Sequence, residues 1–381
     1  MTNEDSTATA DEMIQAVDKK ISAVRTQSLD FSFNELADMH ADGELIIDPE
    51  FQRMFRWSEG GQARFIESLL LELPIPPIFL IEREDRVYEL IDGLQRISSF
   101  LHFRGQLQID GELLEPLVLS DCDIVEELNG KTYADLPRAL EIKLKRSYIR
   151  AEILRKESDP RLRYYMFKRL NTGGERLAEQ EVRNATIRLL NNDFNHFIVN
   201  LSNNADFSYS VDAITENAKK RKFDQELVLR FFAFKNVRHL YKHDIADFLT
   251  DYLEAVSDPT VNVNFDYEVE RSVFEKTFLV IRKIAERLGY GSKIFGTMTV
   301  GGQPKAQFSV YHYEGIVLGL QAVISDLDPE DADAVGLLAE VVRTGKADKE
   351  FLKATGGGKN ERNALRARIE YFSERFERAL D

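Results

Sequence analysis

The sequence contains few of the residues and segments that would mark a secreted or membrane protein. Cys122 is its single cysteine in 381 residues, which excludes an internal disulfide and predicts a small buried side chain at that position. No apolar run approaches the ~20 residues of a membrane span, and the first residues lack the basic stretch of a secretory signal. We therefore expect a cytoplasmic protein without membrane contact.

Positive charge is also scarce, since 50 Lys and Arg face 65 Asp and Glu, for a net charge of −15. This balance argues against nonspecific attraction of the whole surface to nucleic acid. Basic residues nevertheless concentrate between Arg138 and Arg169, where eleven stand against four acidic residues. Within this stretch, residues 143–150 alternate as a strand whose polar face would be cationic. Its predicted DNA-contacting residues are Lys143, Lys145, Arg146 and Arg150. The alternative is a solvated face balanced by acidic residues elsewhere.

Length and patterning predict two domains. We expect a tail with an amphipathic helix over residues 11–26, a first domain over residues 29–205, and a mainly helical domain over residues 206–381. The amphipathic helix could pair with a second copy of the chain or pack on its own body. Helices of the last domain are expected at residues 226–240, 245–256, 269–288, 313–324 and 362–380.

The most informative segment runs from Ile91 to Phe100. Branched and aromatic residues at 77–82 and 87–91 predict a strand hairpin, and the apolar spacing from Ile97 onward predicts a helix beginning near Gln95. The turn between strand and helix presents the side chains of Asp92, Gln95 and Arg96 where helix N–H groups favour a phosphate. Gly93 lets the main chain approach a ligand closely. The alternative is a glycine turn with solvated charges.

Two further segments accompany this turn. The first has Gln52 and Arg53 among aromatic residues, with Arg56 next to them, and is followed by a helix over residues 63–71 and a proline elbow over 73–77. The second has an Asn-x-Gly-Gly turn at 171–174 and a Leu-x-x-Gln-Glu-x-Arg-Asn helix at 177–184. In that helix Gln180, Arg183 and Asn184 share one face, and Glu181 lies one step round it.

The three segments, in this order over residues 29–200, resemble the N-terminal domain family of the GmrSD modification-dependent restriction enzymes and the defence protein SspE. The resemblance implies an α+β domain with a ParB/sulfiredoxin-like fold and a small mixed sheet. A typical member has Asp-Gly-Gln-Gln-Arg where this chain has Leu94 in the third position. Larger members carry a His-Asn-His nuclease domain, and no such signature follows residue 200, so we expect the form without that nuclease.

The resemblance also implies a function: a nucleoside triphosphate hydrolase (GTPase or ATPase) of a prokaryotic restriction or anti-phage system, in which hydrolysis gates DNA engagement or a partner nuclease or modification enzyme. Asp92, Gln95 and Arg96 would be catalytic, with Asp92 positioning Mg²⁺ or water. The residues expected to bind the nucleotide phosphates are Gln52, Arg53, Arg56, Gly93, Asn171 and Glu181. The alternative is a DNA-binding or DNA-nicking module that works without triphosphate hydrolysis.

One glycine-rich segment, residues 355–360, has some features of a phosphate-binding loop. It lacks the Gly-x4-Gly-Lys-Ser/Thr spacing and follows no apolar strand. We expect it to be a flexible lead into the last helix.

Overall fold

The computed structural model describes most of the chain, in the ranges 13–15, 25–47, 55–109, 111–158, 179–187, 190–258, 260–261, 263–299, 301–356 and 358–381. The chain forms two compact units, residues 1–176 and 177–381. None of the helices within the described ranges combines the length and apolar character needed to cross a bilayer.

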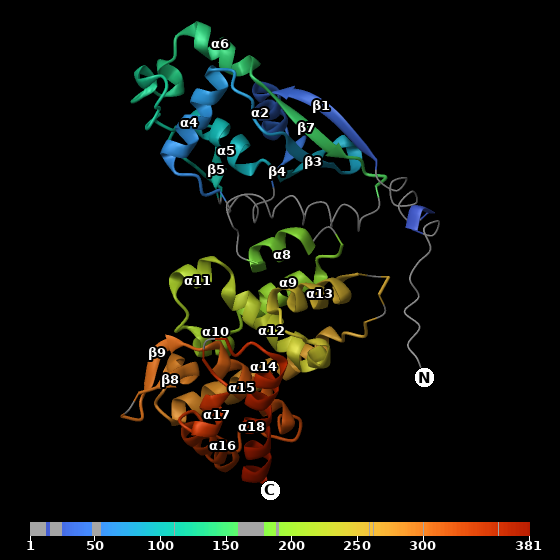
Figure 1. Ribbon diagram of the computed structural model, residues 1–381, viewed down its shortest axis with the longest axis vertical. Helices are drawn as coiled ribbons and strands as arrows, with labels where there is room; N and C mark the ends of the chain where they lie inside the picture. Colours follow the sequence, from blue (N-terminus) through green and yellow to red (C-terminus); the bar gives the residue numbers. More distant parts are fainter. Residues whose placement is uncertain are drawn as a thin grey trace. The chain divides into compact units, whose positions relative to one another are not determined.

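A mixed five-stranded sheet, in the order β1-β7-β3-β4-β2, forms the centre of the first unit (Figure 1). Neighbours β1 and β7, and β3 and β4, run antiparallel, whereas β7 and β3, and β4 and β2, run parallel. The strands are β1 (Thr26–Ser32), β2 (Leu45–Ile46), β3 (Ile78–Glu82), β4 (Tyr88–Asp92) and β7 (Tyr148–Leu154). The predicted hairpin is therefore confirmed as β3 and β4, joined through the short helix η1 (Glu84–Arg86).

Helices of the first unit begin where the sequence supplies caps. Ser58 Oγ accepts the Gly61 N–H at the start of α4, and Ser32 Oγ accepts the Glu35 N–H at the start of α2. These helices are α2 (Phe33–Ala41), α4 (Glu59–Leu70), α5 (Leu94–Phe103) and α6 (Arg138–Arg146), with a small hairpin of β5 (Gln108–Ile109) and β6 (Glu112–Leu113). Figure 1 shows α4 and α5 on the same side of the sheet.

The strand predicted over residues 143–150 is wrong in its first half. Helix α6 continues to Arg146, and β7 begins only at Tyr148. Basic side chains in the last turn of a helix interact favourably with its negative end, which stabilises a helix there. The alternation is present from Tyr148 to Ile153, since Ile149, Ala151 and Ile153 are buried and the residues between them are exposed or half-buried.

The second unit is mainly helical, as predicted, with a small hairpin of β8 (Gly296–Met298) and β9 (Pro304–Phe308). Its helices are α8 (Glu179–Ile187), α9 (Asp193–Ser202), α10 (Ala205–Val211), α11 (Glu216–Lys220), α12 (Phe223–Val237), α13 (Ile245–Ser257), α14 (Tyr267–Arg287), α15 (Val310–Gly319), α16 (Ala332–Gly345), α17 (Lys349–Lys353) and α18 (Arg362–Leu380). Helices α8 and α9 precede the expected boundary at residue 205, yet they pack on α12 and α13 within this unit. The helix predicted over 11–26 lies mostly outside the described residues, and Thr26 belongs to β1.

Candidate functional site

Strand β4 passes into helix α5 through Gly93, which has a left-handed backbone with φ of 106°. A Cβ atom here would lie 2.3 Å from Cγ2 of Ile78, so the backbone angle and the packing both require glycine. As the N-cap residue, Gly93 offers no side-chain acceptor to the first turn of α5. The N-cap residue of α5 therefore makes no side-chain capping hydrogen bond, and the positive end of the helix dipole lies at this turn.

Asp92 and Arg96 form an ion pair across this turn. Nη2 of Arg96 lies 2.7 Å from Oδ2 of Asp92, and Nη1 donates to the carbonyl oxygen of Pro76 at 2.9 Å. The Arg96 side chain is 13% exposed and the Asp92 side chain 33%. The guanidinium is thus held in one orientation between the proline elbow and the turn, while part of the pair stays accessible to a ligand.

Gln95 connects the turn to the segment before α4. Its Oε1 accepts hydrogen bonds from the backbone N–H groups of Arg56 and Trp57, both at 3.0 Å. The structure therefore brings the backbone at Arg56 to the predicted turn. Gln52 and Arg53, which were predicted to close the same pocket, lie outside the described residues.

Behind Trp57 lies a buried hydrogen-bond chain that the sequence did not reveal. Gln62 donates to the carbonyl of Trp57 at 2.9 Å and lies 2.8 Å from Nδ1 of His102, whose Nε2 lies 2.9 Å from the carbonyl oxygen of Glu115. Burial lowers the pKa of His102, against a smaller opposing effect of the Glu115 hydrogen bond. This series of hydrogen bonds fixes the Trp57 backbone against α4 and α5. The only signal in the sequence was a histidine within an apolar run.

Two other predicted residues come from the third segment. Asn171 lies outside the described residues, and Glu181 lies on α8 in the second unit, where it is 5% exposed. Their predicted part in nucleotide binding stays a prediction.

The polar face predicted on that helix exists, but it is buried. Arg183 is 3% exposed and donates to Gln180, to Thr250 of α13 and to the carbonyl of Ala246. Its Nη1 also lies 3.3 Å from Glu226 of α12. Through these contacts Arg183 links α8 to α12 and α13, so its part in the second unit is structural.

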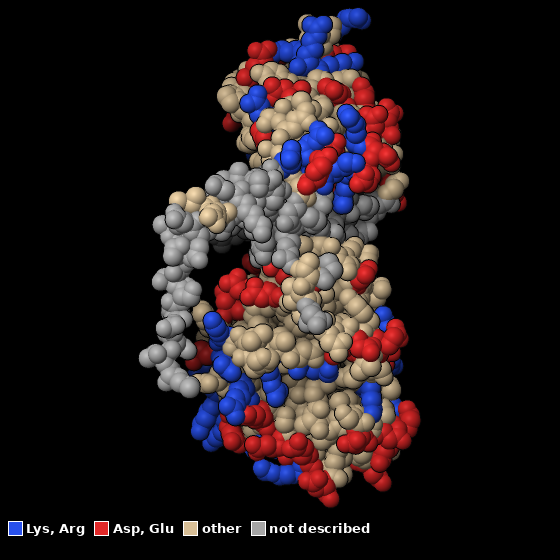
Figure 2. Space-filling view, turned by 90° about the vertical axis from the view of Figure 1, so that its right-hand side faces the viewer, with Lys and Arg blue, Asp and Glu red and all other residues tan. Residues whose placement is uncertain are grey.

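Two of the four residues of the predicted basic face on α6 and β7 pair with acidic neighbours. Lys143 pairs with Glu72 at 3.2 Å, and Arg150 makes two bonds to Asp30, of 3.0 and 3.1 Å. The hydrogen bond from Arg150 lowers the pKa of Asp30. Figure 2 shows Lys and Arg intermixed with Asp and Glu over the first unit.

For the other two predicted basic side chains, the described residues include no such acidic partner. Arg146 is exposed and Lys145 half-buried, and the described part of the chain supplies neither with a hydrogen-bonding or ionic partner. Arg146 also lines a cavity of about 950 Å³ together with the exposed ring of Tyr148.

A metal at Asp92 would rely on few protein ligands. Across the described residues, no group of three or more His, Cys, Asp or Glu side chains converges as a metal site. Mg²⁺ needs only one or two carboxylates when substrate phosphates and water complete its shell. The partly exposed carboxylate of Asp92 meets that requirement.

Residues 33–188 match the family model described as "GmrSD restriction endonuclease, N-terminal domain". No curated protein matches the chain, and no solved structure does. The family match confirms the resemblance predicted from the three segments. The matched residues make up less than half of the chain, so the match shows what this region is similar to.

Proposed function

We propose that the first unit binds a nucleoside triphosphate at the β4–α5 turn and hydrolyses it, and that hydrolysis gates DNA engagement or a partner nuclease in restriction or anti-phage defence. The observation that carries this proposal is the Asp92–Arg96 pair at the amino end of α5, beside a glycine whose positive φ and contact with Ile78 disfavour any side chain. The helix dipole at this end and the guanidinium of Arg96 together favour a polyphosphate.

Each residue of the turn has a role in this proposal. Arg96 turns its donors from the Asp92 carboxylate to phosphate oxygens, and the carboxylate so released holds Mg²⁺ or orients the attacking water. Bound Mg²⁺ would neutralise charge on the phosphates. Gln95 acts as a positioning residue, because its Oε1 keeps the Arg56 backbone beside the turn. Such positioning and charge stabilisation are what phosphoryl transfer requires of a protein.

Phosphate release by the purified chain with Mg²⁺ and either GTP or ATP tests this function. Arg96→Ala is expected to reduce turnover by about 10²-fold or more, since it removes charge stabilisation of the reacting phosphate. Arg64→Ala provides the matched control, because Arg64 is an exposed arginine on α4 of the same unit. A similar loss of turnover in Arg96→Ala and Arg64→Ala contradicts the proposal. So does an absence of phosphate release by the parent chain.

A second candidate function, DNA binding without triphosphate hydrolysis, is favoured by the wide cavity beside Arg146 and Tyr148. Loss of one cationic contact to a DNA phosphate reduces the salt dependence of binding by about one unit of slope. Arg146→Ala should therefore weaken DNA binding and reduce that slope, whereas Arg64→Ala should change neither. Nicking of supercoiled plasmid without any triphosphate would support the nuclease form of this alternative.

A further inference from the structure

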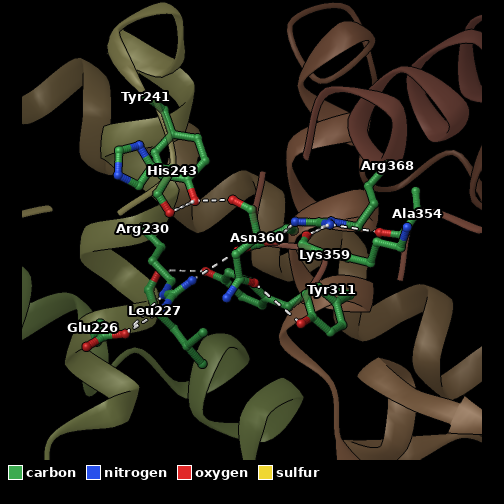
Figure 3. Close-up of polar contacts among 12 residues, drawn as sticks. Glu226, Leu227, Arg230, Tyr241, His243, Tyr311, Ala354, Lys359, Asn360 and Arg368 are labelled. Atoms are coloured by element: carbon green, nitrogen blue, oxygen red, sulfur yellow. Dashed lines mark hydrogen bonds and ion pairs between the residues drawn. The ribbon is translucent and has the colours of Figure 1, made fainter. Parts of the chain in front are cut away.

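A cavity of about 140 Å³ in the second unit has no assigned role. Figure 3 shows the polar residues around it, which come from α12, α15, α18 and the segments before α13 and α18. The polar lining residues are Arg230, Tyr241, Tyr311, Glu314, Asn360 and Arg368. At ~30 Å³ per water molecule, the space holds about four or five waters or one small tetrahedral ion.

The charged part of the lining is two arginines against one glutamate. Glu314 lies 3.0 Å from Nη1 of Arg230 and 2.6 Å from Nη2 of Arg368, so one carboxylate serves both guanidinium groups. Burial alone would lower the pKa of Arg230, but Glu226 and Glu314 outweigh that effect and raise it. Arg230 therefore stays charged. Because Glu226 also pairs with Arg230 and with Arg183, the ion-paired network holds three arginines against two glutamates, an excess of one positive charge.

Arg368 has a buried donor without an acceptor. The residue is 2% exposed, and its Nη1 donates to the carbonyls of Ala354 and Lys359, both at 2.8 Å. Its Nε is buried and finds no hydrogen-bond acceptor among the described residues. The guanidinium carbon lies 4.8 Å from the ring centre of Tyr311. A buried N–H without an acceptor is rare and points to a water or ion at that place.

Lys359 and Asn360, at the end of the glycine-rich segment, lie at this cavity. Besides Lys359, whose carbonyl accepts from Arg368, the carbonyl of Asn360 accepts from Tyr241 Oη, and its Oδ1 lies 3.4 Å from Tyr311 Oη. Asn360 is exposed, so it marks the mouth of the cavity. Burial raises the pKa of Tyr241, which keeps its hydroxyl protonated and able to donate.

Two glycines on α15 allow helix α18 to pack closely against it. A Cβ at Gly319 would lie 2.6 Å from Cβ of Phe372, and one at Gly315 would lie 3.2 Å from the carbonyl oxygen of Arg368. Helix α18 can therefore approach α15 closely enough for Arg368 to reach Glu314.

We propose that this cavity binds a phosphate-type oxyanion, either inorganic phosphate or the phosphate group of a small ester. An oxyanion would accept from Arg368 Nε and balance the excess positive charge, and the Asn360 amide and Tyr311 hydroxyl would close over it. The site belongs entirely to the second unit. It is independent of the nucleotide proposed for the β4–α5 turn.

Titration of the full chain with inorganic phosphate, by calorimetry at constant ionic strength, tests this proposal. Asn360→Asp places a negative charge at the mouth without touching the buried ion pairs, and it should weaken binding by about tenfold or more. Asn217→Asp makes the same charge change at an exposed position on α11 and should leave affinity within about twofold. Tyr311→Phe keeps the ring under Arg368 but removes a hydroxyl, and should cause a smaller loss.

Arg96→Ala separates this site from the turn in the first unit. Arg96→Ala alone should bind phosphate at the second-unit cavity, and adding Asn360→Asp to it should weaken that binding. Loss of all binding in Arg96→Ala, equal affinity in the two aspartate variants, or no binding by the parent chain overturns the proposal. A parallel titration with glycerol phosphate distinguishes the sources: binding of inorganic phosphate alone indicates the free ion, and binding of both indicates that an ester also enters.

Discussion

Gln95 accepts the backbone N–H of Arg56 at 3.0 Å, although 39 residues separate them. The same oxygen accepts the Trp57 N–H, so one amide group of α5 fixes the segment before α4. The residue that the sequence placed among the catalytic groups thus has a visible structural part: it sets where the Arg56 segment lies relative to the turn.

Replacing Gln95 tests this positioning role. Gln95→Leu removes the acceptor of two N–H groups and should lower the free energy of unfolding by about 1–2 kcal/mol. Gln95→Glu keeps an acceptor at the same place and should retain most of the stability. Hydrogen exchange at the Arg56 and Trp57 amides provides the readout: faster exchange in Gln95→Leu alone is expected, and unchanged exchange would show that these bonds do not hold the segment.

Gly93→Ala tests the requirement for glycine at the turn. It combines a left-handed backbone with an overlap on Ile78, and we expect a loss of about 2–4 kcal/mol in unfolding free energy. Gly130→Ala is the matched control, because Gly130 is also left-handed, with φ of 78°, but a Cβ there meets nothing within 4 Å. Chemical denaturation should show the control losing only about 1–2 kcal/mol. Equal losses would mean that contact with Ile78 has no part in the requirement.

We expect Lys346 to make the stability of the second unit depend on pH. It is fully buried, its Nζ donates to the carbonyl of Ile294 at 2.5 Å, and burial lowers its pKa to about 7 from 10.5. Below pH 7 the folded chain must carry this charge in its interior. As pH rises from about 7 towards 10.5, the folded state loses the proton before the unfolded state does, so this residue's contribution to stability increases over that window.

Lys346→Met removes the buried charge while keeping an unbranched apolar chain. The variant should be more stable than the parent near pH 6, and the difference should shrink by about 2–5 kcal/mol on going to pH 10. Denaturant unfolding of both proteins at pH 6 and pH 10 measures this difference in unfolding free energy. A difference that does not depend on pH would show that Lys346 does not titrate in this range.

The local features of the first unit were predictable because they depend on neighbours in the sequence. Branched, aromatic and turn residues predicted the β3–β4 hairpin, and the apolar spacing after Gly93 predicted the start of α5 near Gln95, where the helix begins at Leu94. The strand predicted over residues 143–150 failed because alternating charges on an amphipathic helix end also resemble a strand over a few residues. Only the position of Ser147, the C-cap of α6, separates the two elements.

Features that depend on distant partners were not predictable. Nothing near Arg150 in the sequence indicates its pairing with Asp30, which depends on the register of β1 against β7. Arg183 shares a face with Asn184 as expected, but its burial follows from the packing of α12 and α13. The cavity at Arg368 requires three helices far apart in the sequence.

The central claim is that the β4–α5 turn binds a nucleoside triphosphate. Equilibrium binding of a non-hydrolysable triphosphate with Mg²⁺ tests it most directly, because it measures binding separately from hydrolysis. Loss of Arg96 should weaken binding by about tenfold or more, while Arg64→Ala should bind as the parent chain does. Binding that is equally tight in Arg96→Ala would contradict the account.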